Sequence, residues 1–160
     1  MTRNAPGIVC LPMKTHIEWM ELALNEAKLA AGEDEIPVGA VLVKGSELIL
    51  ADHNRTRQMQ NPLAHAEKLI IDKITSSKIK YLQDYTLYVS LEPCLMCAGM
   101  MIWSRLGALV IGAEEPKSGC AGSVYNVLRN KSFNHEVKII RGIMKEESAA
   151  LLQEFFRSKR

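Results

Sequence analysis

Two short motifs constrain the fold of this chain more than any other feature of its sequence. They are His65-Ala66-Glu67 and Pro93-Cys94-Leu95-Met96-Cys97. An imidazole and two thiolates are ligands that suit zinc, and three protein ligands leave the fourth position open, which is typical of catalytic rather than structural zinc sites. Any fold of this chain must therefore bring the two motifs together around one ion.

The Cys-x-x-Cys pair has two other interpretations, a redox dithiol and half of a four-cysteine zinc site. The remaining cysteines, Cys10 and Cys120, are isolated in the sequence and cannot supply a second spaced pair. A redox dithiol needs no partner histidine or glutamate, whereas here both precede the pair. The joint pattern favours a catalytic zinc site in which the histidine and both cysteines hold the metal and Glu67 transfers protons.

Length and composition are those of an ordinary soluble domain. The chain has 160 residues, of which 48% are hydrophobic and 24% are charged. We expect a single domain over residues 15–160, preceded by a tail over residues 1–14. No apolar run approaches the ~20 residues that a transmembrane helix needs, and the tail lacks the apolar length of a secretory signal. These features predict a cytoplasmic protein with no membrane partner, in which metal chemistry is favoured over disulfides.

Charge is distributed unevenly along the chain. Residues 129–160 hold 8 lysines and arginines against 4 acidic residues, whereas residues 1–128 hold 12 against 14. The C-terminal segment therefore carries a formal charge of +4, and the rest of the chain carries −2. This asymmetry is compatible with an anionic partner at the C-terminal end. On charge alone, a solvated helix face is the simpler explanation.

Segments with helical and strand periodicity alternate along the chain. Thr15-His16-Ile17-Glu18 is a capping box, and the apolar stripe that includes Ile17 predicts a helix that ends at Gly32. Lys44-Gly45-Ser46 predicts a hairpin because it separates two apolar runs. The other predicted strands are 85–91, 107–111 and 136–140, and the other helices begin at Pro62 and Pro93 or span 146–156. This alternation predicts an α/β layered sheet.

The predicted helices also explain how the two motifs meet. Cys94 and Cys97 are three residues apart on the first turn of a helix, so both sulfur atoms lie on one face. His65 lies in the first turns of the preceding helix, and two helix N-termini are therefore predicted to converge on one zinc ion. The positive end of the helix dipole and the metal itself both favour thiolates there.

Beyond these motifs, longer segments carry a resemblance to a known family. The segments are 35–40, 53–55, 89–99, 104–105, 112–123, 133–135 and 151–157. Together they are similar to bacterial tRNA-specific adenosine deaminases over residues 16–160. The motif pair is the signature of zinc nucleobase deaminases in general, whereas the loop 112–123 and the Phe-Phe-Arg ending resemble the tRNA branch specifically.

The resemblance implies a fold and an activity. The implied fold is a three-layer α/β/α cytidine-deaminase-like domain with a central mixed five-stranded sheet. The implied activity is the zinc-dependent hydrolytic deamination of adenosine to inosine, with release of ammonia, at the wobble position of a tRNA anticodon. The implied substrate is the anticodon stem-loop of an arginine tRNA, bound across the interface of a homodimer with one Zn²⁺ per subunit.

The resemblance also implies roles for residues around the metal. His65, Cys94 and Cys97 are expected to hold zinc. Glu67 is expected to protonate N1 of the adenine and then to help ammonia depart. Asn54 is expected to form a hydrogen bond with the flipped base, although a turn residue at the end of the hairpin is the alternative for this position.

Further implied contacts concern the walls of the pocket and the RNA backbone. Ile36 and Val38 are expected to line the base pocket. The family usually has an aspartate, associated with the ribose, where this chain has Glu115. Glutamate keeps the acceptor but is one methylene longer, so the contact with the 2′-OH is expected to shift. The basic residues expected to contact phosphates are Arg157, Lys159 and Arg160.

Two other functions share part of this pattern. A deaminase of a free base or nucleoside, such as guanine or cytidine, has the same zinc site but does not need a basic C-terminus. A non-catalytic zinc protein that binds RNA has no use for an acid such as Glu67 beside its metal. For Phe155 and Phe156, we expect one side chain to belong to the core rather than both to stack on bases.

Overall fold

A β-hairpin forms one edge of the sheet in the computed structural model, which describes residues 13–160. The strands are β1 (Gly39–Lys44) and β2 (Glu47–His53), and they pair antiparallel. Gly45 in the connecting turn has a φ of 61°, a conformation that glycine adopts without steric cost. The predicted hairpin is therefore confirmed. Most of the predicted N-terminal tail, including Cys10, lies outside the described residues.

Three further strands complete a mixed sheet in the order β2-β1-β3-β4-β5. They are β3 (Tyr85–Leu91), β4 (Ala108–Ala113) and β5 (Lys138–Arg141). β3 pairs antiparallel with β1 and parallel with β4, and β4 pairs parallel with β5. The mixed five-stranded sheet that the resemblance implied is therefore present.

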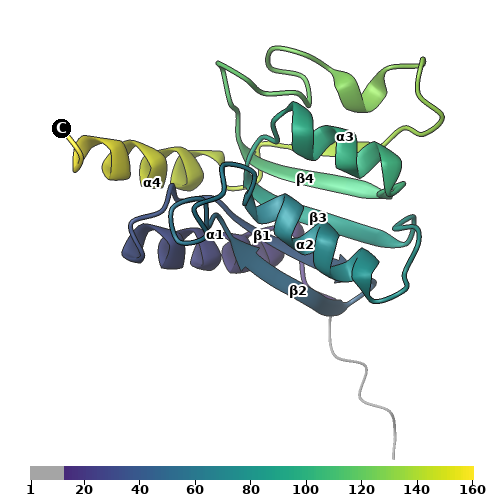
Figure 1. Cartoon of the computed structure of the whole chain (residues 1–160), viewed down its shortest axis with the longest axis horizontal. Helices are drawn as coiled ribbons and strands as arrows, with labels where there is room; N and C mark the ends of the chain where they lie inside the picture. Colours follow the sequence, from purple (N-terminus) through teal and green to yellow (C-terminus); the bar gives the residue numbers. More distant parts are fainter. Residues whose placement is uncertain (1–12) are drawn as a thin grey trace, which may run out of the picture.

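Helices cover both faces of this sheet (Figure 1). α2 (Ala66–Ser76) and α3 (Leu95–Trp103) lie side by side on one face. α1 (His16–Gly32) and α4 (Lys145–Arg157) lie on the other, where α4 projects past the strands and ends in the C-terminus. A short 3₁₀ turn, η1 (Val127–Arg129), follows the loop after β4. The result is the predicted three-layer α/β/α architecture.

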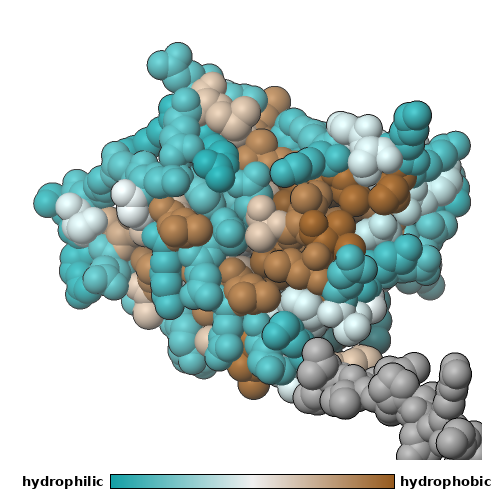
Figure 2. Space-filling model, turned by 90° about the horizontal axis from the view of Figure 1, so that it is seen from below, coloured by the Kyte–Doolittle hydropathy of each residue, from teal (hydrophilic) through white to brown (hydrophobic). Residues whose placement is uncertain are grey.

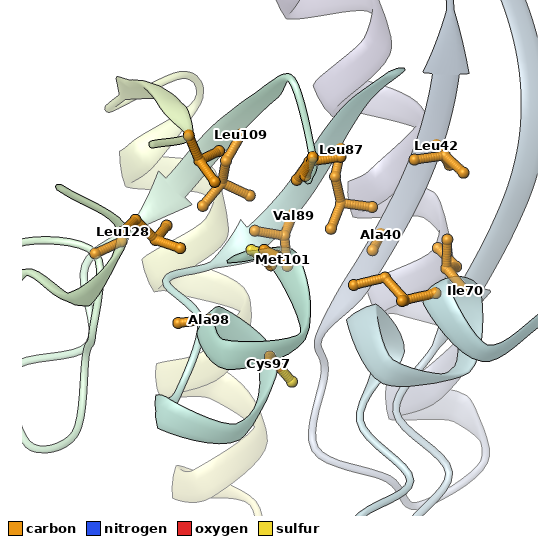
Figure 3. Packing of buried hydrophobic residues seen from close by; sticks show 14 of the residues in the cluster. Ala40, Leu42, Ile70, Leu87, Val89, Cys97, Ala98, Met101, Leu109 and Leu128 are labelled. Carbon is orange, nitrogen blue, oxygen red and sulfur yellow. The ribbon is translucent and has the colours of Figure 1, made fainter. Parts of the chain in front are cut away.

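The larger hydrophobic core lies between the sheet and the pair α2–α3 (Figure 3). Leu87 and Leu109 from the central strands pack there with Ile70 of α2 and Met101 of α3, and each is at most 1% exposed. Complete burial of such a side chain contributes about 1.5 to 3 kcal/mol. Cys97 belongs to the same packed layer, so the second cysteine of the motif is held by core packing as well as by its helix.

A smaller core lies under α1. Trp19, Met20 and Ala23 pack against Val41, Tyr88 and Val110 of the sheet. Thr15 begins this helix with both hydrogen bonds of the predicted capping box. The sequence places Ile17 on the buried stripe, but its side chain is 55% exposed, because Trp19 and not Ile17 meets the sheet.

The start of α2 also differs from the prediction. The proline preference predicts that the helix begins at Pro62, whereas it begins at Ala66. Asn61 explains the difference, because its Oδ1 accepts the N–H of Leu63 at 2.9 Å and its carbonyl accepts the N–H of Ala64 at 3.1 Å. These bonds form a turn that delays the helix and leaves His65 at its N-cap position.

β2 is an edge strand: it pairs with β1 on one side, and no other described strand pairs with it on the other side. Its Leu48 is 45% exposed, and Ile49 and Leu50 are half-buried. Figure 2 views the molecule from this side and shows apolar side chains gathered in one area, with hydrophilic residues around it. No helix within residues 13–160 has both the length and the apolar character to cross a membrane.

Candidate active site

The three predicted zinc ligands come from two helix N-termini. His65 is the N-cap of α2 and Cys94 is the N-cap of α3, and neither side chain forms a capping hydrogen bond. Cys97 lies three residues after Cys94, within the first turn of α3. Both N-cap residues have extended backbone, and their side chains approach each other.

The ligand atoms have the spacing of a tetrahedral site. His65 Nδ1 lies 3.6 Å from the Sγ of Cys94 and 3.7 Å from the Sγ of Cys97, and all three ligand atoms lie within 4.8 Å of one another. Zinc bonds of about 2.3 Å to sulfur and about 2.05 Å to nitrogen at tetrahedral angles place N and S about 3.6 Å apart. Both cysteines are free thiols rather than a disulfide. The donor set therefore fits Zn²⁺.

The two cysteines differ in acidity before a metal binds. A hydrogen bond with Cys97, supported by one with His65, lowers the pKa of Cys94 to about 4. The same bond and burial raise the pKa of Cys97, and the bond with Cys94 raises the pKa of His65. Because zinc binds thiolate and neutral imidazole, its binding must release protons from this site, and its affinity must rise with pH.

Glu67 lies beside this cluster in the first turn of α2. Its side chain is 3% exposed, and burial raises its pKa to about 7. A carboxyl group with a pKa near neutrality gains and loses a proton readily at physiological pH, which suits a general acid and base. Glu67 is not among the residues that could jointly hold a metal, so its carboxylate is available for proton transfer.

A pocket of about 1180 Å³ opens over His65, Glu67 and Cys94. One wall comes from the segment before β1 and the end of the hairpin, a second from the ends of β3 and β4 with the loop after β4, and a third from α4 and the residues that follow it. The residues of these walls are Ile36, Val38, Asn54, Thr56, Leu91, Glu92, Ala113, Glu114, Glu115, Pro116, Lys117, Ser118, Ala149, Ala150, Leu152, Gln153, Glu154, Phe156, Arg157 and Arg160. The predicted pocket residues Ile36, Val38, Asn54 and Glu115 therefore share one cavity with Glu67.

The predicted phosphate-binding residues are placed differently from one another. Arg157 and Arg160 line the pocket. Lys159 does not, because its ammonium group pairs with Asp34 and lies 5.2 Å from the centre of the Phe155 ring. The two phenylalanines of α4 also differ in burial: Phe155 is buried, whereas Phe156 is 49% exposed and lines the pocket. The expectation that one of them belongs to the core is thus confirmed.

Asn54 is buried and held by polar neighbours behind the pocket. Its Nδ2 donates to Thr56 Oγ1 at 3.4 Å and to Glu35 Oε2 at 3.5 Å. Glu35 is completely buried, and it also accepts the N–H of Gln58 at 2.7 Å and the hydroxyl of Thr56 at 3.2 Å. Sequence reasoning did not single out Glu35, because its partners lie some twenty residues away in the chain.

Glu115 lines the pocket, but its backbone and carboxylate are engaged within the loop after β4. Its N–H donates to Glu92 Oε2 at 3.1 Å, and its Oε1 accepts the N–H of Lys117 at 2.9 Å. Sequence reasoning also did not assign a role to Glu92. The only signal for it was its place within the segment 89–99 that carries the resemblance.

Comparison with known proteins agrees with this geometry. The MafB19-like deaminase family matches residues 14–160. A tRNA-specific adenosine deaminase from Bacillus subtilis is 43% identical over 89% of this chain and 89% of its own length. A solved structure from work on A-to-I editing by tRNA:A34 deaminases is 38% identical, with a TM-score of 0.80, over 84% of this chain and 99% of that chain. A structure of guanine deaminase from Nitrosomonas europaea shares the fold at 23% identity, with a TM-score of 0.75, over 95% of this chain and 88% of that chain.

The extent of these matches decides the family. The match to the deaminase family includes both motifs and every described helix and strand. The Bacillus subtilis relative is similar in length as well as in sequence, so the likeness is not confined to the metal motif that many deaminases share. The chain therefore belongs to the family of tRNA-specific adenosine deaminases, which are enzymes.

Proposed function

We propose that this protein hydrolyses adenosine to inosine at the wobble position of a tRNA anticodon and releases ammonia. One observation carries the proposal. The cluster His65, Cys94 and Cys97 lies beside the buried carboxyl group of Glu67, at the base of a pocket that is walled by predicted nucleoside contacts. The relatives named as tRNA-specific adenosine deaminases support the choice of substrate.

In this proposal, His65, Cys94 and Cys97 hold one zinc ion per subunit. The ion supplies Lewis acidity that makes water a nucleophile near neutral pH. Glu67 accepts a proton from the attacking water and delivers a proton to N1 of the adenine. Glu67 then takes the proton of the new C6 hydroxyl group and transfers it to the departing amino group, so that adenosine and water become inosine and ammonia. In the metal-free site, burial raises the pKa of Glu67 to about 7, and a carboxyl group with a raised pKa suits transfer in both directions.

The remaining pocket residues bind and orient the target nucleotide. Ile36 and Val38 pack against the faces of the flipped base, and Asn54 forms a hydrogen bond with its edge. Glu35 and Thr56 fix the orientation of the Asn54 amide through the bonds described above. Glu115 accepts a hydrogen bond from the ribose, at a position shifted by its extra methylene relative to aspartate.

The outer part of the pocket contacts the RNA backbone. Arg157 at the end of α4 and Arg160 beyond it line the pocket, and they neutralise phosphates of the anticodon loop. Lys159 already pairs with Asp34, so its contribution to phosphate binding is smaller than that of either arginine. The alternative explanation of the C-terminal charge is a solvated helix face; both arginines are exposed, and their place at the pocket supports the phosphate-binding proposal.

We further propose a homodimer and a specific tRNA partner. Exposed apolar side chains at the ends of α3 support a contact surface, because Trp103 is 82% exposed and Leu95 is 63% exposed. The substrate is the anticodon stem-loop of an arginine tRNA, as in the family that this chain resembles. We also propose that residues 15–160 form one domain after a tail over residues 1–14, and that the protein acts in the cytoplasm.

Purified zinc-loaded protein incubated with total tRNA tests the proposal. Nucleoside digestion and mass spectrometry are expected to detect inosine, and sequencing is expected to place it at the wobble position of arginine tRNA. Free adenosine, cytidine and guanine are the comparison substrates. Rapid turnover of a free base or nucleoside, with no inosine in tRNA, would establish the alternative function and refute this one.

A further inference from the structure

Glu92 is a buried carboxylate that the proposed mechanism does not use. It follows β3 directly, and its side chain is 0% exposed. Its backbone N–H donates to the carbonyl of Ala113 at 2.9 Å, which joins the ends of β3 and β4. Burial of a charged group is costly unless hydrogen bonds satisfy it. The burial of the Glu92 carboxylate therefore requires hydrogen-bond partners around it.

Both carboxylate oxygens of Glu92 accept hydrogen bonds from the loop after β4. Oε1 accepts the N–H groups of Ala121 and Ser123, each at 3.0 Å. Oε2 accepts the N–H of Glu115 at 3.1 Å and the hydroxyl of Ser123. One side chain thus binds the beginning and the end of the segment 115–123.

Arg141 of β5 completes this arrangement from the other side. Its Nη2 lies 3.6 Å from Glu92 Oε2 and donates to Ser123 Oγ at 3.1 Å, and its Nη1 donates to the carbonyl of Ala121. The guanidinium group compensates the charge of Glu92 and binds the same end of the loop. The segment is therefore held between a carboxylate and its counterion.

The two glycines of the segment show how tightly its backbone packs on this pair. A Cβ at Gly119 would lie 2.6 Å from the Glu92 carboxylate and 2.5 Å from the carbonyl of Glu115. A Cβ at Gly122, where φ is +130°, would collide with Arg141. The glycine spacing in this loop thus follows from the close approach of the Glu92–Arg141 pair.

We propose that Glu92 is a positioning residue that fixes the segment 115–123 as a wall of the substrate pocket. The inference rests on the proposed function, because that segment supplies Glu115, Pro116, Lys117 and Ser118 to the pocket. Its Glu115 is the residue assigned to the ribose. Glu92 is among the residues that line the pocket, but its side chain is 0% exposed, so it acts on the nucleotide through this loop. Its loss therefore impairs substrate binding more than the chemical step.

The hydrogen-bond pattern requires a carboxylate rather than an amide. The substitution Glu92→Gln would place an NH₂ group against donors in either orientation, since each carboxylate oxygen of Glu92 accepts at least two donors. The change is nearly isosteric, so it removes acceptors without opening a cavity. Hydrogen bonds to a charged group are the strong ones, and losing them leaves buried N–H groups unsatisfied.

The test compares Glu92→Gln with Glu136→Gln, a matched change at an exposed carboxylate outside the site. Kinetics on an anticodon stem-loop are expected to show KM about 10-fold or more higher for Glu92→Gln, with kcat within about threefold of wild type. Amide hydrogen exchange, which needs no substrate, is expected to accelerate at Glu115, Ala121 and Ser123. Zinc content is expected to stay at the wild-type level, and Glu136→Gln is expected to change none of these quantities.

Wild-type KM and unchanged amide exchange in Glu92→Gln would overturn the inference. So would a loss of zinc with unchanged KM, because Glu92 would then support the metal site instead. If Glu92→Gln does not fold, Ser123→Ala decides, since it removes one donor to Glu92 on an exposed residue. It is expected to raise KM about two- to fivefold, and an unchanged KM there overturns the inference. An inactive wild type with a loop that loosens in Glu92→Gln would refute the proposed function alone.

Discussion

Replacing Glu67 with glutamine separates the catalytic role of this residue from its effect on stability. The glutamine keeps the size of the side chain but cannot transfer a proton. We expect deamination to fall by ~10² to 10⁴, while zinc content persists because the three ligands are unchanged. The stability effect follows from the raised pKa of Glu67, which burial shifts from 4.5 to about 7 in the metal-free protein.

The sign and size of that effect can be worked out from the pKa shift. A carboxyl group with a raised folded-state pKa stabilises the fold fully below pH 4.5, and this contribution is lost as pH rises through 7. Between about pH 5.5 and pH 8, linkage gives a loss of about 2 kcal/mol. Glutamine does not titrate, so Glu67→Gln lacks this loss. Relative to wild type, the metal-free variant should gain about 2 kcal/mol over the same interval.

Urea unfolding of both proteins, stripped of metal and kept reduced, measures this difference across the interval from about pH 5.5 to 8. Using the difference between the two proteins cancels the titration of shared groups that do not interact with Glu67, whereas His65 and Cys97, whose pKa values Glu67 raises, contribute to the difference. A difference in the free energy of unfolding that is independent of pH would refute the assignment of Glu67 as a desolvated carboxyl group. Normal turnover on tRNA by zinc-loaded Glu67→Gln would refute its catalytic role.

Further outcomes are expected at the metal site, at the C-terminal cations and behind the pocket. Cys97→Ser should lower the zinc content to less than about a tenth of an ion per chain, as measured by elemental analysis. In the wild type, the affinity for zinc should rise with pH because the pKa of the Cys97 thiol is raised. Alanine at Arg157, Lys159 and Arg160 together should raise KM for a stem-loop and flatten its salt dependence with little change in kcat, whereas Lys159→Ala alone should do less; an unaltered salt slope in the triple variant would contradict the assignment. Glu35→Gln should raise KM about 5-fold or more, because it weakens the support of the pocket asparagine; an unchanged KM with normal zinc content would show that this support is unimportant.

Local signals were sufficient where an element depends on neighbours in the sequence. The strand predicted over 85–91 is β3 with the same bounds, and the capping box at Thr15 begins α1 as expected. The start of α2 was not predictable from the proline preference, because the turn at Asn61 competes with the helix. Likewise, the exposure of Ile17 depends on which face of α1 meets the sheet.

In the candidate site, too, some residues could be assigned from the sequence and others could not. His65, Cys94 and Cys97 could be assigned from their spacing, since metal ligands must be residues of particular types at the ends of particular elements. The roles of Glu35 and Glu92 could not be assigned from the sequence, because the donors that bind a buried carboxylate come from distant segments. Glu92, for example, accepts bonds from residues 23 to 31 positions away.

The sequence by itself therefore determined the α/β alternation, the candidate metal-ligand set and the acid beside it, because periodicity, capping and ligand chemistry depend on short segments. Only the tertiary structure decided that α4 forms a wall of the pocket and that Glu92 binds the loop 115–123. It also decided that Lys159 pairs with Asp34, whereas Arg157 and Arg160 line the pocket. The physical reason is that burial, ion pairing and pocket shape arise from contacts between segments far apart in the chain. Such contacts exist only after the sheet and its two helical layers have assembled.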